Sequence, residues 1–175
     1  MRDSQPPHTL QPIAFGFGAA LVAMVGTNWG AAQYRRARDI AWTGASIVAA
    51  LCGTIGLAVA FEPGLWIGLF SNDAEVTRLG SLYLRIVGPA YLCFGLGLGL
   101  FYVTQGVGHG VAAMNANAIR LMTSAGCGLV AIYWLDLGAA GFFAAVAAGF
   151  CVYAVLLVRA VFGVRAPDAA VVTNS

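Results

Sequence analysis

Five long apolar runs, separated by short polar stretches, make up most of the chain. Each run has about the 20 residues that an α-helix needs to cross the hydrocarbon core of a bilayer. We therefore predict an all-α integral membrane protein whose helical bundle occupies residues 13–164, between a polar N-terminal tail (1–12) and a polar C-terminal tail (165–175). The five transmembrane helices are expected at about residues 13–33, 40–61, 82–103, 113–135 and 139–162.

Turn and cap signals break the segment between the second and third runs. Residues 62–64 (Glu-Pro-Gly) are expected to end the second helix, because proline disrupts a helix and glycine favours a turn. Residues 65–70 are too few to span a membrane and are expected at its interface. Asn72 is predicted to cap the next helix with Glu75 completing a capping box, and Pro89 is predicted to kink that helix.

The composition identifies lipid as the solvent of this chain. Hydrophobic residues make up 60% of it and charged residues 9%, whereas a soluble domain is about a quarter charged. So few charges cannot build a water-facing surface. The formal net charge is only +2, and the basic residues, all arginines, lie near the ends of the runs. They therefore resemble membrane-orientation signals, and no nucleic-acid partner is expected.

The arginines also predict the orientation. Arg35, Arg36 and Arg38 follow the first run, and such a cluster beside an apolar span marks a cytoplasmic loop. Successive loops lie on opposite sides of the membrane. The N-terminus is therefore expected outside and the C-terminus in the cytoplasm of a multi-pass protein in the cell (plasma or inner) membrane. An external polar N-terminus with an odd number of spans implies a preceding helix. We therefore expect a fragment that lacks upstream helices or borrows them from a partner.

Small residues four positions apart predict faces on which helices approach closely. These faces are Gly26/Gly30, Gly64/Gly68, Gly95/Gly99 and Gly141/Ala145/Gly149. The cysteines lie inside apolar runs without a C-x-x-C spacing, so we expect buried, separate thiols and neither a metal nor a redox site. They are Cys52, Cys93, Cys127 and Cys151. No catalytic constellation is recognisable, and the chain is predicted not to be an enzyme.

Polar side chains within the runs are the candidates for function. Facing lipid is unfavourable for them, so they should face other helices or a wet cavity. Hydroxyl groups have the alternative of bonding to their own helix's carbonyls. Arg120 either extends to the cytoplasmic edge or acts inside a cavity. The predicted substrate-pathway residues are Thr27, Asn28, Tyr91, Gln105, Asn115 and Asn117.

Three ordered motifs resemble the C-terminal half of MATE (multidrug and toxic compound extrusion) transporters. Residues 25–33 (V-G-T-N-W-G-A-A-Q), followed by R-A-R at 36–38, resemble that family's V-G-Q-N-x-G-A-G-N…R-A-R signature. Residues 69–76 (L-F-S-N-D-A-E-V) resemble its L-F-x-x-D-P-E-V segment, and residues 105–108 (Q-G-V-G) its Q-G-x-G turn. The resemblance covers about residues 13 to 164. Three departures stand out: Thr27 replaces the usual glutamine, Ala32 a glycine, and His109 a common acid.

The resemblance implies that these are the last five of twelve helices, forming most of one lobe of an inverted-repeat transporter. Such transporters export organic cations and drugs in exchange for sodium ions or protons, through a cavity that alternately faces each side. The implied partners are the lipid bilayer, small organic cations and the missing N-terminal lobe, in cis or in trans. No acidic residue falls within a predicted span, so this chain is not expected to couple ions alone.

Two other functions remain open from the sequence. A lipid-linked sugar flippase of a related fold is expected to carry basic groups facing its cavity, and Arg120 is the one candidate here. A non-transporting membrane scaffold or accessory subunit would use the small-residue faces to pack against a larger complex.

Overall fold

Helices account for all regular secondary structure in the residues that the computed structural model describes, 11–71 and 73–163. Each predicted run is helical over most of its length, and the predicted interfacial segment forms the short helix α3. In chain order the elements are α1 (Gln11–Gly30), α2 (Tyr34–Phe61), α3 (Pro63–Gly68), α4 (Ala74–Val87), the 3-10 turn η1 (Gly88–Ala90), α5 (Tyr91–Gly106), α6 (Gly110–Tyr133) and α7 (Gly138–Gly163).

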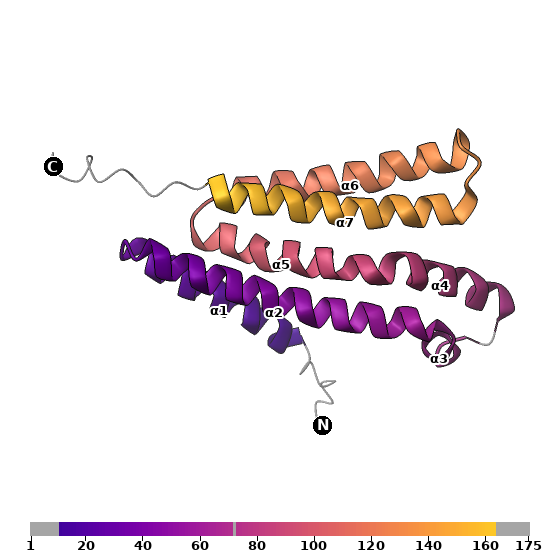
Figure 1. Cartoon of the computed structure of the whole chain (residues 1–175), viewed down its shortest axis with the longest axis horizontal. Coiled ribbons are helices and arrows are strands. Elements are labelled where there is room, and N and C mark those ends of the chain that lie inside the picture. Colours follow the sequence, from indigo (N-terminus) through magenta and orange to yellow (C-terminus); the bar gives the residue numbers. More distant parts are fainter. Residues whose placement is uncertain (1–10, 72, 164–175) are drawn as a thin grey trace, which may run out of the picture.

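The long helices lie side by side along the long axis of the molecule (Figure 1). α6 and α7 form a hairpin along one side, α1 and α2 pack together along the other, and the row α4–η1–α5 lies between them. α5 contacts α1, α2, α6 and α7. It is therefore the central helix of the bundle.

Three helical segments are long and apolar enough to cross a membrane: Tyr34–Phe61, Ala74–Gly106 and Gly138–Gly163. They contain the second, third and fifth predicted spans. α1 and α6, of 20 and 24 residues, cover most of the first and fourth, and their crossing of the membrane stays a prediction. α2 begins at Tyr34, six residues before the expected start, and this brings Asp39 inside the helix.

The third span is interrupted at Pro89, as predicted. The helix changes to a 3-10 turn at Gly88–Ala90 and resumes as α5. Proline has no amide hydrogen for the carbonyl of Arg85, so the regular α-helical pattern stops there.

The predicted capping box before α4 is wrong. Asn72 lies outside the described residues, and the capping residue is Asp73. Asp73 Oδ1 accepts hydrogen bonds from the backbone N–H of Glu75 at 2.8 Å and of Val76 at 3.3 Å. The Glu75 side chain instead pairs with Arg78 at 2.8 Å, one turn along the helix.

Glycines bring α5 into backbone contact with its neighbours, as two of the predicted faces require. A Cβ on Gly99 would lie 2.5 Å from Cα of Ala45, and one on Gly95 would lie 2.7 Å from the carbonyl oxygen of Val48, both on α2. A Cβ on Gly26 of α1 would lie 3.0 Å from the carbonyl oxygen of Gly106. No side chain larger than hydrogen fits at these crossings without displacing a backbone.

The other predicted small-residue faces have mixed outcomes. Gly149 packs on Ser124 and Gly141 on Ala131, so the α7 face does join α7 to α6. Around Gly30, Gly64 and Gly68 a Cβ would meet nothing within 4 Å in the described structure, so the prediction of close contact there is wrong.

The connection between α1 and α2 contains a strained residue. Ala32 has φ +58°, in the left-handed region that side chains with a Cβ disfavour by about 1 to 2 kcal/mol. The resemblance places a glycine at this position, and glycine adopts that conformation without strain. The backbone therefore adopts a left-handed turn at Ala32, a conformation that glycine would adopt with less strain than alanine.

We expect Gly99→Ala to destabilise the protein by about 1 to 3 kcal/mol, because the methyl group must separate α5 from α2. Gly126→Ala is the matched control: Gly126 is also helical, but no atom lies within 4 Å of its Cβ position. It should be neutral or stabilise slightly through helix propensity. Thermal unfolding of the detergent-purified protein measures both, and equal midpoints for the two variants would contradict the contact.

Ala32→Gly should stabilise the protein by about 0.5 to 1 kcal/mol, because relief of the left-handed strain exceeds the added freedom of the unfolded chain. Ala31→Gly is the control, since Ala31 has no positive φ, and it should destabilise by about 0.5 to 1 kcal/mol. The same unfolding assay compares them. A lower midpoint for Ala32→Gly than for the wild type would refute the strain argument.

Candidate functional site

A groove of about 350 Å³ runs between α1 and α2. On α1, Phe17, Leu21 and Met24 recur at helical spacing and therefore share one face. On α2, Asp39 and Thr43 lie one turn apart on the facing side. The full lining is Phe17, Leu21, Met24, Asp39, Ile40, Thr43, Gly44 and Ile47.

Asp39 contributes the one charged side chain of this lining. The rest is an aromatic ring, a flexible thioether, a hydroxyl group and aliphatic carbon, a lining that suits apolar ligands of varied shape. Asp39 is exposed, so its carboxylate is accessible to a cation that enters the groove. The groove therefore has the chemistry to hold an organic cation.

Asp39 had no predicted role because the second span was expected to begin at residue 40. The signal was available, since Asp39, Thr43 and Ile47 are spaced four apart, but it becomes visible only when the helix begins at Tyr34.

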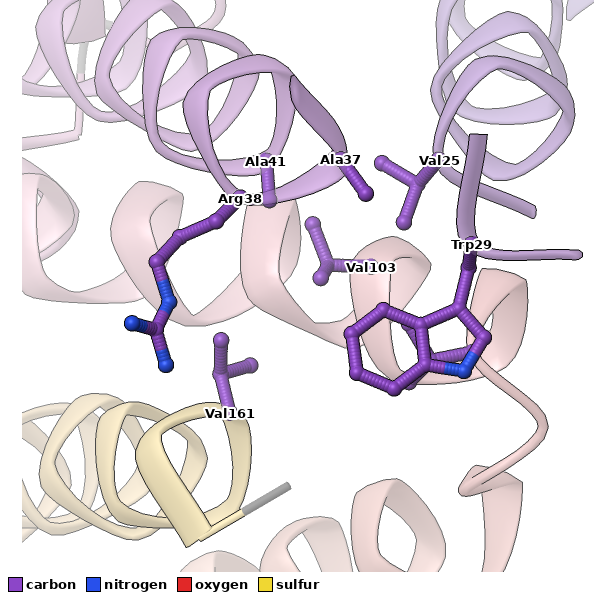
Figure 2. A pocket seen from close by; sticks show the side chains of 8 residues that line it. Val25, Trp29, Ala37, Arg38, Ala41, Val103 and Val161 are labelled. Atoms are coloured by element: carbon purple, nitrogen blue, oxygen red, sulfur yellow. The ribbon is translucent and has the colours of Figure 1, made fainter. Parts of the chain in front are cut away.

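A second hollow lies at the end of the bundle where α2 begins. The predicted loop position of Arg35, Arg36 and Arg38 is wrong, because all three lie in the first turns of α2. The lining of the hollow comes from α1, α2, α5, the turn after α5 and α7, with the Trp29 indole and the Arg38 side chain facing it beside apolar groups (Figure 2). The volume of about 30 Å³ accommodates roughly one water molecule. This hollow is therefore too small for an organic substrate.

Three predicted pathway residues lie at this same end. Gly26 contacts Gly106, so the following residues Thr27 and Asn28 and the preceding Gln105 come from adjoining turns of α1 and α5. The Thr27 hydroxyl donates to the carbonyl of Ala23 at 2.8 Å. The alternative of bonding to the residue's own helix thus holds for this threonine.

Asn28 likewise donates from Nδ2 to the carbonyl of Met24 at 2.7 Å. On α6, Asn115 is exposed and Asn117 is half-buried. Tyr91 lies apart from these residues and packs edge-on against Phe94 and Phe150, with ring centres 6.1 and 5.9 Å away. None of the six predicted residues lines either hollow described above, and their part in a pathway stays a prediction.

Arg120 does not extend to the edge of the bundle. Its guanidinium carbon lies 5.3 Å from the ring centre of Tyr153 and 5.7 Å from those of Phe94 and Phe150. Phe150 and Tyr153 are in the middle of α7. Of the two alternatives for Arg120, extension to the cytoplasmic edge is therefore wrong, because aromatic faces hold the charge at mid-helix.

The magnitudes explain why the charge is tolerated there. An arginine at mid-membrane, where the predicted crossing of α6 places Arg120, costs about 2.5 to 3.5 kcal/mol on insertion scales. Each ring face contributes about 0.5 to 2 kcal/mol of cation–π attraction. Three rings together therefore offset most of the cost.

The cysteines also differ from expectation. The Sγ atoms of Cys93 on α5 and Cys151 on α7 lie 3.6 Å apart, so two thiols that are distant in sequence do converge. Cys127 and Cys151 are exposed rather than buried. Across residues 11–71 and 73–163, no group of three or more His, Cys, Asp or Glu side chains is placed to hold a metal ion.

Comparison with known proteins places this helical chain in a family. Residues 9–134 match the model of the family described as MatE, and the match extends through α1 to α6. No curated protein and no solved structure matches the chain. The match covers well over half of the chain, and the apolar helices agree with a membrane-embedded protein. The chain therefore belongs to the MatE family of membrane transporters.

Proposed function

We propose that this chain forms one wall of the substrate pathway in a cation-coupled multidrug antiporter, which exports organic cations in exchange for sodium ions or protons. The observation that carries the proposal is the groove between α1 and α2, whose lining includes an aromatic ring, a thioether and the Asp39 carboxylate. This lining complements a flat, positively charged drug. Family membership supports transport in general.

The proposed mechanism is movement of the bundle against an opposite lobe, without covalent chemistry. The glycine contacts that join α5 to α1 and α2 favour movement as one body, since close-packed helices resist local deformation. In this proposal the opposite lobe lies in cis or in trans, and the chain is most of one lobe of a longer transporter. Asp39 is then the carboxylate of this lobe that binds the substrate or the coupling ion.

The distribution of charge supports the proposed orientation in the cell membrane. The first turn of α2 with Arg35 and Arg36, the turn after α5 and the last turn of α7 lie at one end of the bundle (Figure 1). Asp73 and Asp136 lie at the opposite end. Clustered arginines favour the cytoplasmic side, so the proposed topology has the arginine end and the C-terminus inside and the N-terminus outside.

The groove favours this function over the two alternatives. A flippase for lipid-linked sugars needs basic groups to hold phosphate, whereas the charged side chain in the groove is acidic. Arg120 lies elsewhere, among the rings of α5 and α7. A scaffold would use a small-residue face to bind a larger complex. Such a face does not account for an open groove that contains a carboxylate.

We expect Asp39→Asn to lower ethidium efflux from cells that express the full-length transporter by about fivefold to tenfold, because the cation loses its counter-charge. Asp39→Glu should retain most of the activity. Asp136→Asn, which removes a carboxylate from the α6–α7 connection, is the control and should leave efflux unchanged. Equal efflux for the wild type and Asp39→Asn, at equal expression, would reject the groove as a cation site.

Asn28→Leu should weaken efflux while insertion into the membrane stays intact, because the pathway loses an amide whose oxygen is available to a substrate. Thr54→Val is the matched control, since Thr54 also bonds to its own helix, at the carbonyl of Ala50. Efflux assays with surface labelling of the same cells separate transport from insertion. Unchanged efflux in Asn28→Leu would remove Asn28 from the pathway.

A further inference from the structure

Arg120 has hydrogen-bond donors that the described structure leaves without an acceptor. Its Nε atom is enclosed by protein and has no partner among residues 11–71 and 73–163. A guanidinium has five N–H donors, all in one plane, and cannot be deprotonated in a protein. An enclosed donor without an acceptor is unfavourable. The two terminal nitrogens of the guanidinium are not among the enclosed atoms, so an acceptor that approaches Arg120 would meet these two groups.

The three aromatic rings do not supply that partner. They attract the positive charge through their faces, but the in-plane N–H groups need oxygen lone pairs. No acidic residue occurs in α5, α6 or α7 as the structure describes them. The charge is therefore held in place while its directional donors remain available.

Other donors lie on the same face of α6. Asn117 and Ser124 are three residues before and four after Arg120, a spacing that brings side chains together on a helix. Both are half-buried, and Ser124 packs on Gly149 of α7. An amide, a guanidinium and a hydroxyl thus form a polar stripe beside the ring cluster of Phe94, Phe150 and Tyr153.

We propose that this stripe is an oxyanion site, in which the Arg120 guanidinium binds a carboxylate, sulfonate or phosphate group. Planar guanidinium donors match two oxygens of such a group, and the neighbouring rings accommodate an aromatic skeleton attached to it. The site is separate from the Asp39 groove and does not depend on the proposed export of cations. The oxyanion comes either from a transported ligand or from a carboxylate elsewhere in the same protein.

The test uses two fluorescent probes that differ by one group. Anilinonaphthalene sulfonate carries the oxyanion, and phenyl-naphthylamine is the same aromatic skeleton without it. Their binding is measured on the full-length protein in lipid nanodiscs. If a ligand supplies the oxyanion, Arg120→Gln weakens binding of the sulfonate by about tenfold or more and leaves binding of the neutral probe unchanged.

Two matched variants control for charge and packing. Arg159→Gln removes an exposed arginine from α7 and should change neither probe. Arg120→Lys keeps the charge and should retain part of the sulfonate binding, which also serves the test if Arg120→Gln fails to fold.

If a carboxylate of the same protein fills the site, the probes do not distinguish the variants. Instead, without any probe, Arg120→Gln unfolds at a lower temperature than Arg120→Lys at neutral pH, and the difference disappears in acid as the carboxylate is protonated. The Tyr153 phenol stays neutral over that range. The proposal would be overturned if Arg120→Gln bound both probes as the wild type does and if, in addition, its unfolding temperature differed from that of Arg120→Lys by the same amount at every pH or did not differ at all.

Discussion

The backbones of α2 and α5 meet at Gly95 and Gly99, and the arrangement of the bundle depends on that contact. Lipid is as apolar as the helix surfaces, so helices associate through close packing rather than by escape from water. The glycines let α5 approach α2 at backbone distance, and Gly106 does the same toward α1. α5 is thereby central, and α6 is held mainly through its hairpin with α7.

Most charges lie near the two ends of this bundle, including Asp39, which follows Arg38 near the start of α2, whereas Arg120 lies at mid-helix. Asp39 is in the groove on the α1–α2 side, whereas Arg120 is among rings of α5 and α7. The central helix α5 lies between α2 and α7, so the two charges do not neutralise each other. Each is then available to a separate partner. The apolar bundle thus offers one acidic and one basic location, both formed between helices.

Membership of the MatE family gives the chain a transport role without specifying a ligand. The match runs through α1 to α6, and α7 lies beyond it. α7 nevertheless supplies two of the three rings around Arg120. The strained turn at Ala32 joins the two helices that form the Asp39 groove. The ring cluster around Arg120 therefore depends on a helix outside the family match, and the strained turn connects the two helices of the Asp39 groove.

The sequence by itself determined the membrane class, the helical runs, the break at Pro89 and the family, because these depend on run length, on proline and on motifs that lie along the chain. The glycine faces of α5 and α7 were also predictable from spacing alone. Only the tertiary structure decided that Asp73 caps α4, that Asp39 lines a groove, that Cys93 meets Cys151 and that three rings hold Arg120. Helices that are apolar on all sides carry little pattern to fix their rotation, so lateral contacts between them follow from the packing of the whole bundle.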